Sequence, residues 1–454
     1  MKELHILEKG FQLSTEILFL YNWNNKKGCG NMKIQKWIAR TSILGGFGLL
    51  LVFSFFIMKE SVPDKIWMVQ GEEENFNFHV PMTGVVEAEG LEVFGNQSPA
   101  IERKEIHVDL NKDFSMKSDN RGSYSIVCRL FGIFEVKEVA VEVIEEESVV
   151  PCGIPVGIYV KTEGVLIIGT GAVTGTDGMN YEPAANIVKS GDYIKTINEQ
   201  VVKTKENVIE AINGCEGKSV VLGILRDGEY IELKVEPVKT GGNEYKLGIW
   251  IRDDLAGVGT LTFCDSAGNY GALGHQVSDM DTGTKVLMSE GTLYEAKIAG
   301  ITKGEKGKPG EVSGIITYLD QFKLGTVEEN TEVGIYGKLE RMPEQLQGVE
   351  YCAIGMKQEV QEGPAKIVSY LSGERKEYDI EIIGMDYSGS NLNKGILFEV
   401  TDPELLELTG GIVQGMSGSP IIQNGKMIGA VTHVFVQDAA RGYGVFAEQM
   451  IIYR

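Results

Sequence analysis

The pattern of hydrophobic and polar positions changes several times along the chain. Residues 1–31 are mixed and have no clear period, whereas residues 41–58 (TSILGGFGLLLVFSFFIM) form an unbroken, uncharged apolar run. As a helix with a rise of about 1.5 Å per residue, this run would reach roughly 27 Å, close to the thickness of the hydrocarbon core of a bilayer. The run therefore predicts an N-terminal transmembrane helix.

Charged residues flank the apolar run and predict its orientation. Three basic residues lie between Met32 and the run, and Lys59 follows it. Basic residues on the N-terminal side favour an inside N-terminus, so residues 1–40 are predicted to form a cytoplasmic-side segment. A cleaved signal peptide is the alternative, although the run is long for one and no A-x-A site follows. The true start codon is either Met1 or Met32.

A β-rich stretch follows the apolar run. Residues 76–80, 123–127 and 139–143 alternate apolar and polar positions with period two, between turns that contain Gly, Asn and Pro. This pattern predicts a small β-sandwich-like domain over residues 66–150. We can tie no group of its residues to chemistry.

The pattern changes again over residues 153–238. A helical spacing appears at 204–213, and an Asp-Gly pair at 227–228 predicts a hairpin. The pattern A-x-I-x-x-x-G-D-x-I-x-x-I-N, which starts at Ala185, resembles PDZ domains. This resemblance implies a module that accepts an extended peptide as an added strand, and a module that only packs against its neighbours is the alternative. The implied docking edge is the strand of Val156, Gly157, Ile158, Tyr159 and Val160.

Residues 246–454 contain short β-like runs separated by glycine-containing turns. One short helical candidate, residues 403–408, interrupts them. About 200 residues of short strands fit two packed β-barrels. The chain as a whole is therefore predicted to be mainly β.

A glycine-rich stretch in this region contains the candidate nucleophile. Ser417 lies in Gly-Ile-Val-Gln-Gly-Met-Ser-Gly-Ser-Pro, and the Asn-Gly pair at 424–425 predicts a hairpin after it. Glycine permits positive φ, so the N–H groups of Gly415 and Ser417 can point at one developing oxyanion. The alternative is a turn whose serines only satisfy local backbone. Ser419, which precedes a proline, is interpreted as structural.

One of the five histidines matches this serine as a base. His275 lies in Gly-Ala-Leu-Gly-His, on a glycine-rich bend after an alternating segment. A Ser/His mechanism needs an imidazole that takes the hydroxyl proton and later gives it to the leaving amine. We expect His275 in the first barrel and Ser417 in the second. His433, on a strand after the serine, is predicted to line the substrate cleft or to be buried.

Composition excludes some functional classes. The net charge of −21 and the pI near 4.8 argue against nucleic-acid binding, which needs a basic surface. None of the six cysteines forms a C-x-x-C pair, so neither a zinc site nor a thioredoxin-type site is predicted. Their wide spacing favours scattered buried thiols over disulfides. We expect no cofactor.

The apolar run, the PDZ-like pattern, the histidine motif and the serine motif occur in this order in one chain. Together they resemble the stage IV sporulation protein B family of serine peptidases, from about Met32 to the C-terminus. The order of His before Ser also resembles chymotrypsin-type peptidases, which implies a chymotrypsin-like double β-barrel.

The resemblance implies a specific pathway. Such a peptidase is made in the forespore, is anchored in the inner forespore membrane with its catalytic part in the intermembrane space, and cleaves itself. It then cleaves a membrane-bound regulator of an intramembrane metalloprotease, which activates the late mother-cell pro-sigma factor, pro-sigma-K. The alternative is an anchored PDZ scaffold whose inactive β-barrel domain only recruits partners.

Three carboxylates are candidates for the residue that orients the histidine. The resemblance implies Asp402 for this role, fifteen positions before Ser417. Asp320 is a rival because it lies nearer the midpoint between His275 and Ser417, and Asp279 is another because it is four residues from the histidine. Asp402 also precedes a proline, which suits the N-cap of a helix.

Overall fold

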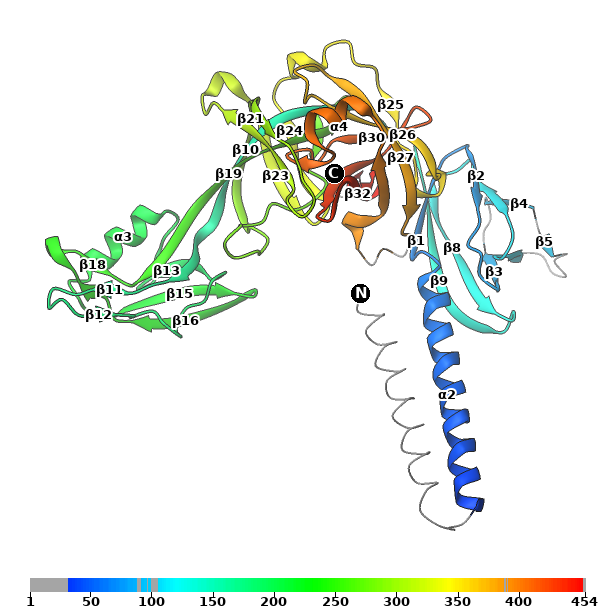
Figure 1. Ribbon diagram of the computed structural model, residues 1–454, viewed down its shortest axis with the longest axis horizontal. Coiled ribbons are helices and arrows are strands. Elements are labelled where there is room, and N and C mark those ends of the chain that lie inside the picture. The colour runs from blue at the N-terminus through cyan, green and yellow to red at the C-terminus, as the bar shows by residue number, and fades with distance from the viewer. Residues whose placement is uncertain are drawn as a thin grey trace. The chain divides into compact units, whose positions relative to one another are not determined.

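The computed structural model describes residues 32–87, 91–95, 97–98, 105–387, 389 and 391–451. The chain divides into two compact units, Met1–Ser61 and Val62–Arg454. In the first unit, helix α2 (Met32–Glu60) contains the predicted apolar helix (Figure 1). In the part of the chain that the structure describes, no helix is both long and apolar enough to cross a membrane. The predicted segment before Met32 lies outside the described residues.

The second unit begins with a β domain made of two sheets. One sheet has six strands in the order β1-β9-β8-β3-β6-β5, and the other has three in the order β2-β7-β4. Alternate residues are buried along β2 and in the second half of β9, as the period of two predicts. The strands are β1 (Lys65–Val69), β2 (Glu73–Phe76), β3 (Met82–Glu87), β4 (Glu92–Gly95), β5 (Gln97–Ser98), β6 (Glu105–Asp109), β7 (Phe114–Lys117), β8 (Gly122–Leu130) and β9 (Phe134–Ile144).

Six strands of the next region pair in a ring, which we call the first barrel. The pairs run β10-β19-β20-β24-β23-β21, and β21 pairs with β10 again. The six strands are β10 (Ser148–Thr170), β19 (Ile249–Cys264), β20 (Asn269–Ala272), β21 (Met288–Thr302), β23 (Lys323–Thr331) and β24 (Gly334–Leu339). The neighbouring elements are β22 (Gly310–Ile316), β25 (Cys352–Ala353) and the 3₁₀ turns η2 (Asp320–Phe322), η3 (Glu344–Leu346) and η4 (Lys357–Glu359).

The PDZ-like module is inserted into the first barrel between β10 and β19. Both strands are long because they leave the barrel and continue, still paired, into the sheet of the module (Figure 1). Helix α3 (Lys205–Gly214) starts at the N-cap Thr204, which confirms the helical pattern of the sequence. The other elements are β11 (Val173–Thr174), β12 (Asn180–Tyr181), β13 (Tyr193–Ile197), β14 (Gln200–Val201), β15 (Val220–Arg226), β16 (Glu229–Val235), β17 (Val238–Lys239), η1 (Gly241–Asn243) and β18 (Tyr245–Lys246).

The strand predicted as the peptide-docking edge belongs to the first barrel instead. It is paired on both sides, since Val156 lies opposite Gly259 of β19 and also opposite Glu295 of β21. A strand with two partners has no free edge for a peptide. The prediction is therefore wrong for all five residues, Val156, Gly157, Ile158, Tyr159 and Val160.

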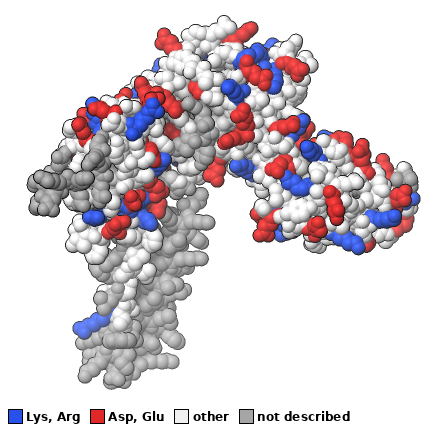
Figure 2. All heavy atoms as spheres, turned by 180° about the vertical axis from the view of Figure 1, so that it is seen from behind, with Lys and Arg blue, Asp and Glu red and all other residues white. Residues whose placement is uncertain are grey.

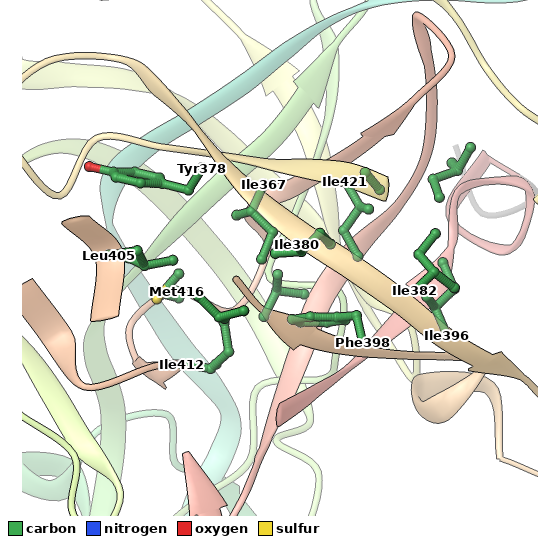
Figure 3. Close-up of a cluster of buried hydrophobic side chains, with 14 of the residues drawn as sticks. Ile367, Tyr378, Ile380, Ile382, Ile396, Phe398, Leu405, Ile412, Met416 and Ile421 are labelled. Carbon is green, nitrogen blue, oxygen red and sulfur yellow. The ribbon is translucent and has the colours of Figure 1, made fainter. Parts of the chain in front are cut away.

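A second, closed barrel is built from contiguous chain. Its strands close in the order β26-β27-β28-β32-β31-β30 around a dry core that includes Ile367, Phe398 and Ile421 (Figure 3). The elements are β26 (Gly363–Ser369), β27 (Lys376–Met385), η5 (Leu392–Lys394), β28 (Ile396–Val400), α4 (Pro403–Thr409), β29 (Val413–Gln414), β30 (Pro420–Gln423), β31 (Lys426–Phe435), β32 (Asp438–Phe446) and α5 (Ala447–Ile451). The predicted mainly β architecture with two barrels is therefore found.

Candidate active site

Ser417 lies on the loop between β29 and β30 of the second barrel. Met416, next to it, is buried in the barrel core beside Ile412 and Leu405, which anchors the loop (Figure 3). On the other side Gly418 has φ +95°, and a Cβ added there would come within 2.5 Å of the Thr260 carbonyl oxygen. Glycine is required at this position because both the conformation and the space exclude a side chain.

Hydrogen bonds hold the serine loop against its surroundings. The hydroxyl of Ser417 donates to the carbonyl of Thr432 at 2.8 Å, and the hydroxyl of Thr260 donates to the carbonyl of Gly415 at 2.8 Å. Among the hydrogen bonds of the described residues, the amide of Ser417 has no acceptor. An amide without an acceptor at the nucleophile is what an oxyanion site requires. Ser419 is fully buried, in agreement with a structural role.

His275 follows β20 of the first barrel on a strained bend. Leu273 and Gly274 both have positive φ, +72° and +71°. The bend turns the imidazole so that its Nδ1 lies 2.9 Å from the carbonyl oxygen of Gln276. Burial lowers the pKa of His275 below its usual value of 6.5, and the contact with Gln276 offsets only part of this effect. A neutral imidazole at pH 7 can accept a proton, as a general base must.

His275 and Ser417 line one cleft of about 1040 Å³. The first barrel contributes β19 and the bend at His275, and the second barrel contributes the serine loop and part of β31. The two residues that the sequence places 142 positions apart are thus on one surface, as a Ser/His mechanism needs. In this structure the serine hydroxyl donates to Thr432 rather than to the imidazole.

His433 also lines this cleft, as the sequence predicts. Its ring centroid lies 5.7 Å from that of His275, and the two rings are tilted by 45°. Desolvation at the cleft wall, followed by the nearby His275 and Lys394, lowers the pKa of His433 to about 4. His433 is therefore neutral at pH 7 and adds no positive charge beside the candidate base.

The structure does not bring Asp402 to His275. One carboxylate oxygen of Asp402 accepts the amides of Glu404 and Leu405 at 2.9 Å, and the other faces the amide of Asp379 at 3.3 Å. Asp402 is thus the N-cap of α4, as its position before a proline allows. The prediction that it orients the histidine is wrong in this structure.

The two rival carboxylates do not contact the histidine either. Asp279 is buried and bonded to Arg252 and to the amides of Asp281 and Thr282. Asp320 is exposed in η2. In the described part of the chain, the polar contact of the His275 ring is a backbone carbonyl rather than a carboxylate.

Comparisons with known proteins match one family model and several solved structures. Residues 243–451 match the family SpoIVB peptidase S55. Comparison with curated protein sequences finds no match. Among solved structures, a PDZ domain of an SdrC-like protein from Listeria monocytogenes is 19% identical, covering 20% of this chain and 90% of its own, with a TM-score of 0.16. The active form of a protease from M. tuberculosis is 15% identical, covering 43% and 72%, with a TM-score of 0.25.

Two barrels that share a cleft lined by a serine loop and a histidine define a serine peptidase. The match over residues 243–451 shows that this part of the chain is similar to the SpoIVB peptidase S55 family. This confirms the resemblance drawn from the sequence. The match begins inside the PDZ-like module and includes β19 but not β10, so the first barrel also uses a strand from outside the matched residues.

Sequence reasoning missed two residues that support the site. Thr260 binds the carbonyl of Gly415 across 155 positions of sequence, and Thr432 accepts the Ser417 hydroxyl across 15. No local motif marks either threonine, because both act through contacts made only when the barrels are folded. Of the predicted catalytic and oxyanion residues, the structure brings His275, Ser417 and Gly415 to the same cleft, which His433 also lines.

Proposed function

We propose that this chain is a sporulation endopeptidase that cleaves itself and then a membrane-bound regulator of an intramembrane metalloprotease. Cleavage of that regulator leads to activation of the late mother-cell sigma factor from its pro-form. The shared cleft of His275 and Ser417 carries the peptidase part of this proposal. The family match over residues 243–451 supports the sporulation part, through the name of the family.

The proposed reaction is acyl transfer. The Ser417 hydroxyl leaves Thr432 and donates to His275, which takes the proton as Oγ attacks the peptide carbonyl. The Ser417 amide donates to the oxyanion that forms, with Gly415 as the second predicted donor. His275 then gives its proton to the leaving amine. A water molecule next takes the place of the serine hydroxyl: it gives a proton to His275, attacks the acyl group and releases it from Ser417.

We place the peptidase on the outer side of the inner forespore membrane, anchored by residues 41–58. The basic residues before the apolar run support this orientation. Acidic and basic side chains are interspersed over the face seen in Figure 2, so that face offers a mixed surface to protein partners.

Labelling of the purified full chain with a fluorophosphonate probe tests the enzymatic part. The wild type should be labelled at Ser417, and the Ser417→Ala variant should not. Mass spectrometry of the mature N-terminus tests self-cleavage, which Ser417→Ala should abolish. A wild-type protein that never reacts at Ser417 would instead favour the anchored scaffold with an inactive barrel.

A further inference from the structure

Strand β19 has one edge without a partner strand over most of its length. Its other edge pairs with β10 from Ile249 to Cys264. On the open edge, pairing with β20 begins only at Leu261. Among the described residues no strand pairs with that edge between Ile249 and Gly259. Its backbone groups are therefore available to an added strand.

The open edge starts in the PDZ-like module. There Ile249 and Ile251 pack on the core of the module, beside helix α3. Asp253, further along the strand, accepts the amide of Lys205 in the first turn of α3 at 2.9 Å. The edge and the helix are thus held side by side at this end.

The same edge ends at the nucleophile. Arg252 and the stretch 254–259 line the cleft that contains His275 and Ser417. One residue further, the hydroxyl of Thr260 holds the carbonyl of Gly415 in the serine loop. Strand β22 comes close to this edge at Gly314, where an added Cβ would meet the Val258 side chain, and the adjoining Ala256 and Gly257 are exposed.

We propose that this edge, residues 249–259, is a substrate track that joins the PDZ-like module to the catalytic cleft. The occupant is the segment of an extended substrate that follows the scissile bond, paired antiparallel to β19. This inference rests on the proposed peptidase function. Antiparallel pairing places the scissile bond near Ser417 and runs the C-terminal side of the substrate toward the module.

The dimensions set the length of the occupant. Ten residue steps separate Ile249 from Gly259, which at roughly 3.3 Å per residue is about 33 Å. A substrate needs about ten extended residues after the scissile bond to use the whole track. Folded segments and short peptides cannot do so, which makes local unfolding of the substrate a condition for efficient cleavage.

Exposed apolar side chains lie beside the track. Trp250 is 65% exposed in the module, and Met280, which lines the cleft, is 95% exposed. Arg252 is already paired with Asp279 and Asp281, on either side of Met280 in the sequence. The track therefore suits a segment with apolar side chains at alternate positions, held mainly by its backbone.

A length series tests the track in the full chain. Fluorogenic peptides that share one cleavable sequence are extended on the C-terminal side from two to twelve residues, with alternating valine and serine. We expect kcat/KM to rise roughly tenfold or more up to about ten residues and then to level off, because added ladder hydrogen bonds each contribute modestly. A flat dependence on length would overturn the track.

Two matched variants locate the effect. Trp250→Ala should lower kcat/KM for the twelve-residue extension and leave the two-residue peptide unchanged. Tyr230→Ala removes an exposed aromatic side chain from β16 of the same module and should leave both unchanged. Equal effects of the two variants on the long peptide would contradict the assignment to β19.

A binding measurement separates this inference from the proposed function. The Ser417→Ala protein is titrated with two versions of the long peptide, each N-methylated at every second residue. The methylated residues are the odd positions in one phase and the even positions in the other. Strand pairing predicts that one phase loses binding by about tenfold and the other does not. Equal binding of both phases overturns the track even where Ser417 reacts with a fluorophosphonate. A phase-dependent loss supports the track even where Ser417 does not react.

Discussion

The two barrels carry one half of the site each but are built from the chain in different ways. The second barrel takes all six of its strands from the stretch between Gly363 and Phe446, in which only the short elements η5, α4 and β29 lie outside the barrel. The first barrel joins β10 to β19 across a whole inserted module, so that Lys161 lies opposite Asp254. The residues of the serine loop can therefore be recognised from a short stretch of sequence. The barrel that positions His275 forms only when strands far apart in the sequence pair with each other.

This difference between the barrels also explains which contacts of the serine loop are made within one barrel and which are made between the two. Met416 anchors the serine loop in the core of its own barrel, and Gly418 donates to Val431 of the same barrel at 2.7 Å. The remaining contact comes from the first barrel, through Thr260. One barrel thus shapes the nucleophile loop, and the other brings the base and the wall along which a substrate can lie.

Removal of one catalytic side chain from each barrel tests whether the two halves act as one site. Ser417→Ala and His275→Ala should each lower peptide hydrolysis by several powers of ten, and the double variant should be no worse than either single one. Rates of peptide cleavage by the purified proteins measure this. A double variant that multiplies the two losses would show that the residues do not act together.

Truncation of a core side chain tests how far the second barrel supports the loop. Phe398→Ala removes a fully buried ring and should cost about 3–5 kcal/mol of unfolding free energy. Urea denaturation followed by tryptophan fluorescence gives the value. An exposed aromatic replacement, Tyr351→Ala just before β25, serves as the control and should change stability little.

Replacement of Asp402 separates the cap from the catalytic role that the family resemblance implies. Asp402→Ala should cost about 1 kcal/mol of stability, since the amides of Glu404 and Leu405 lose their acceptor. Asp402→Asn keeps an acceptor and should restore most of it. The fluorophosphonate labelling rate of the folded protein should stay the same in both. A large loss of labelling in both variants would give Asp402 a role at His275 after all.

The pH dependence gives the smallest effect. His275 must be neutral to take the serine proton, and burial lowers its pKa below 6.5. Activity should therefore be retained as the pH falls through 6.5 and be lost only at lower pH. The acid limb of kcat/KM, measured with a peptide substrate, checks this. An acid limb above pH 6.5 would contradict the buried, uncharged imidazole.

The sequence predicted the features that depend on local chemistry. Ser417 between glycines, the bend at His275, the N-cap signal at Asp402 and the helix after Thr204 all follow from short patterns. The error at 156–160 has a different origin. A strand pattern does not reveal how many strands will pair with it. Both edges of β10 are paired with strands whose residues lie about 100 or more positions away in the sequence.

The choice of Asp402 as the orienting residue failed for a related reason. Proximity to Ser417 in sequence does not place a carboxylate near His275, which comes from another barrel. The peptide groups at the start of α4 compete for the same oxygens and win because they are adjacent in the chain. Thr260 and Thr432 show the converse: neither threonine lies in a recognisable motif, yet both bind the serine loop in the folded protein.

The junction of the PDZ-like module with the first barrel has a practical consequence. Lys161 and Asp254 are opposite each other on paired strands, so the module enters and leaves the barrel at one point, with its two ends about 5 Å apart. Any folded unit with similarly close ends can be grafted there without disturbing the strand ring. The peptidase thus offers a site at which the whole module can be exchanged by recombination, as a single cassette.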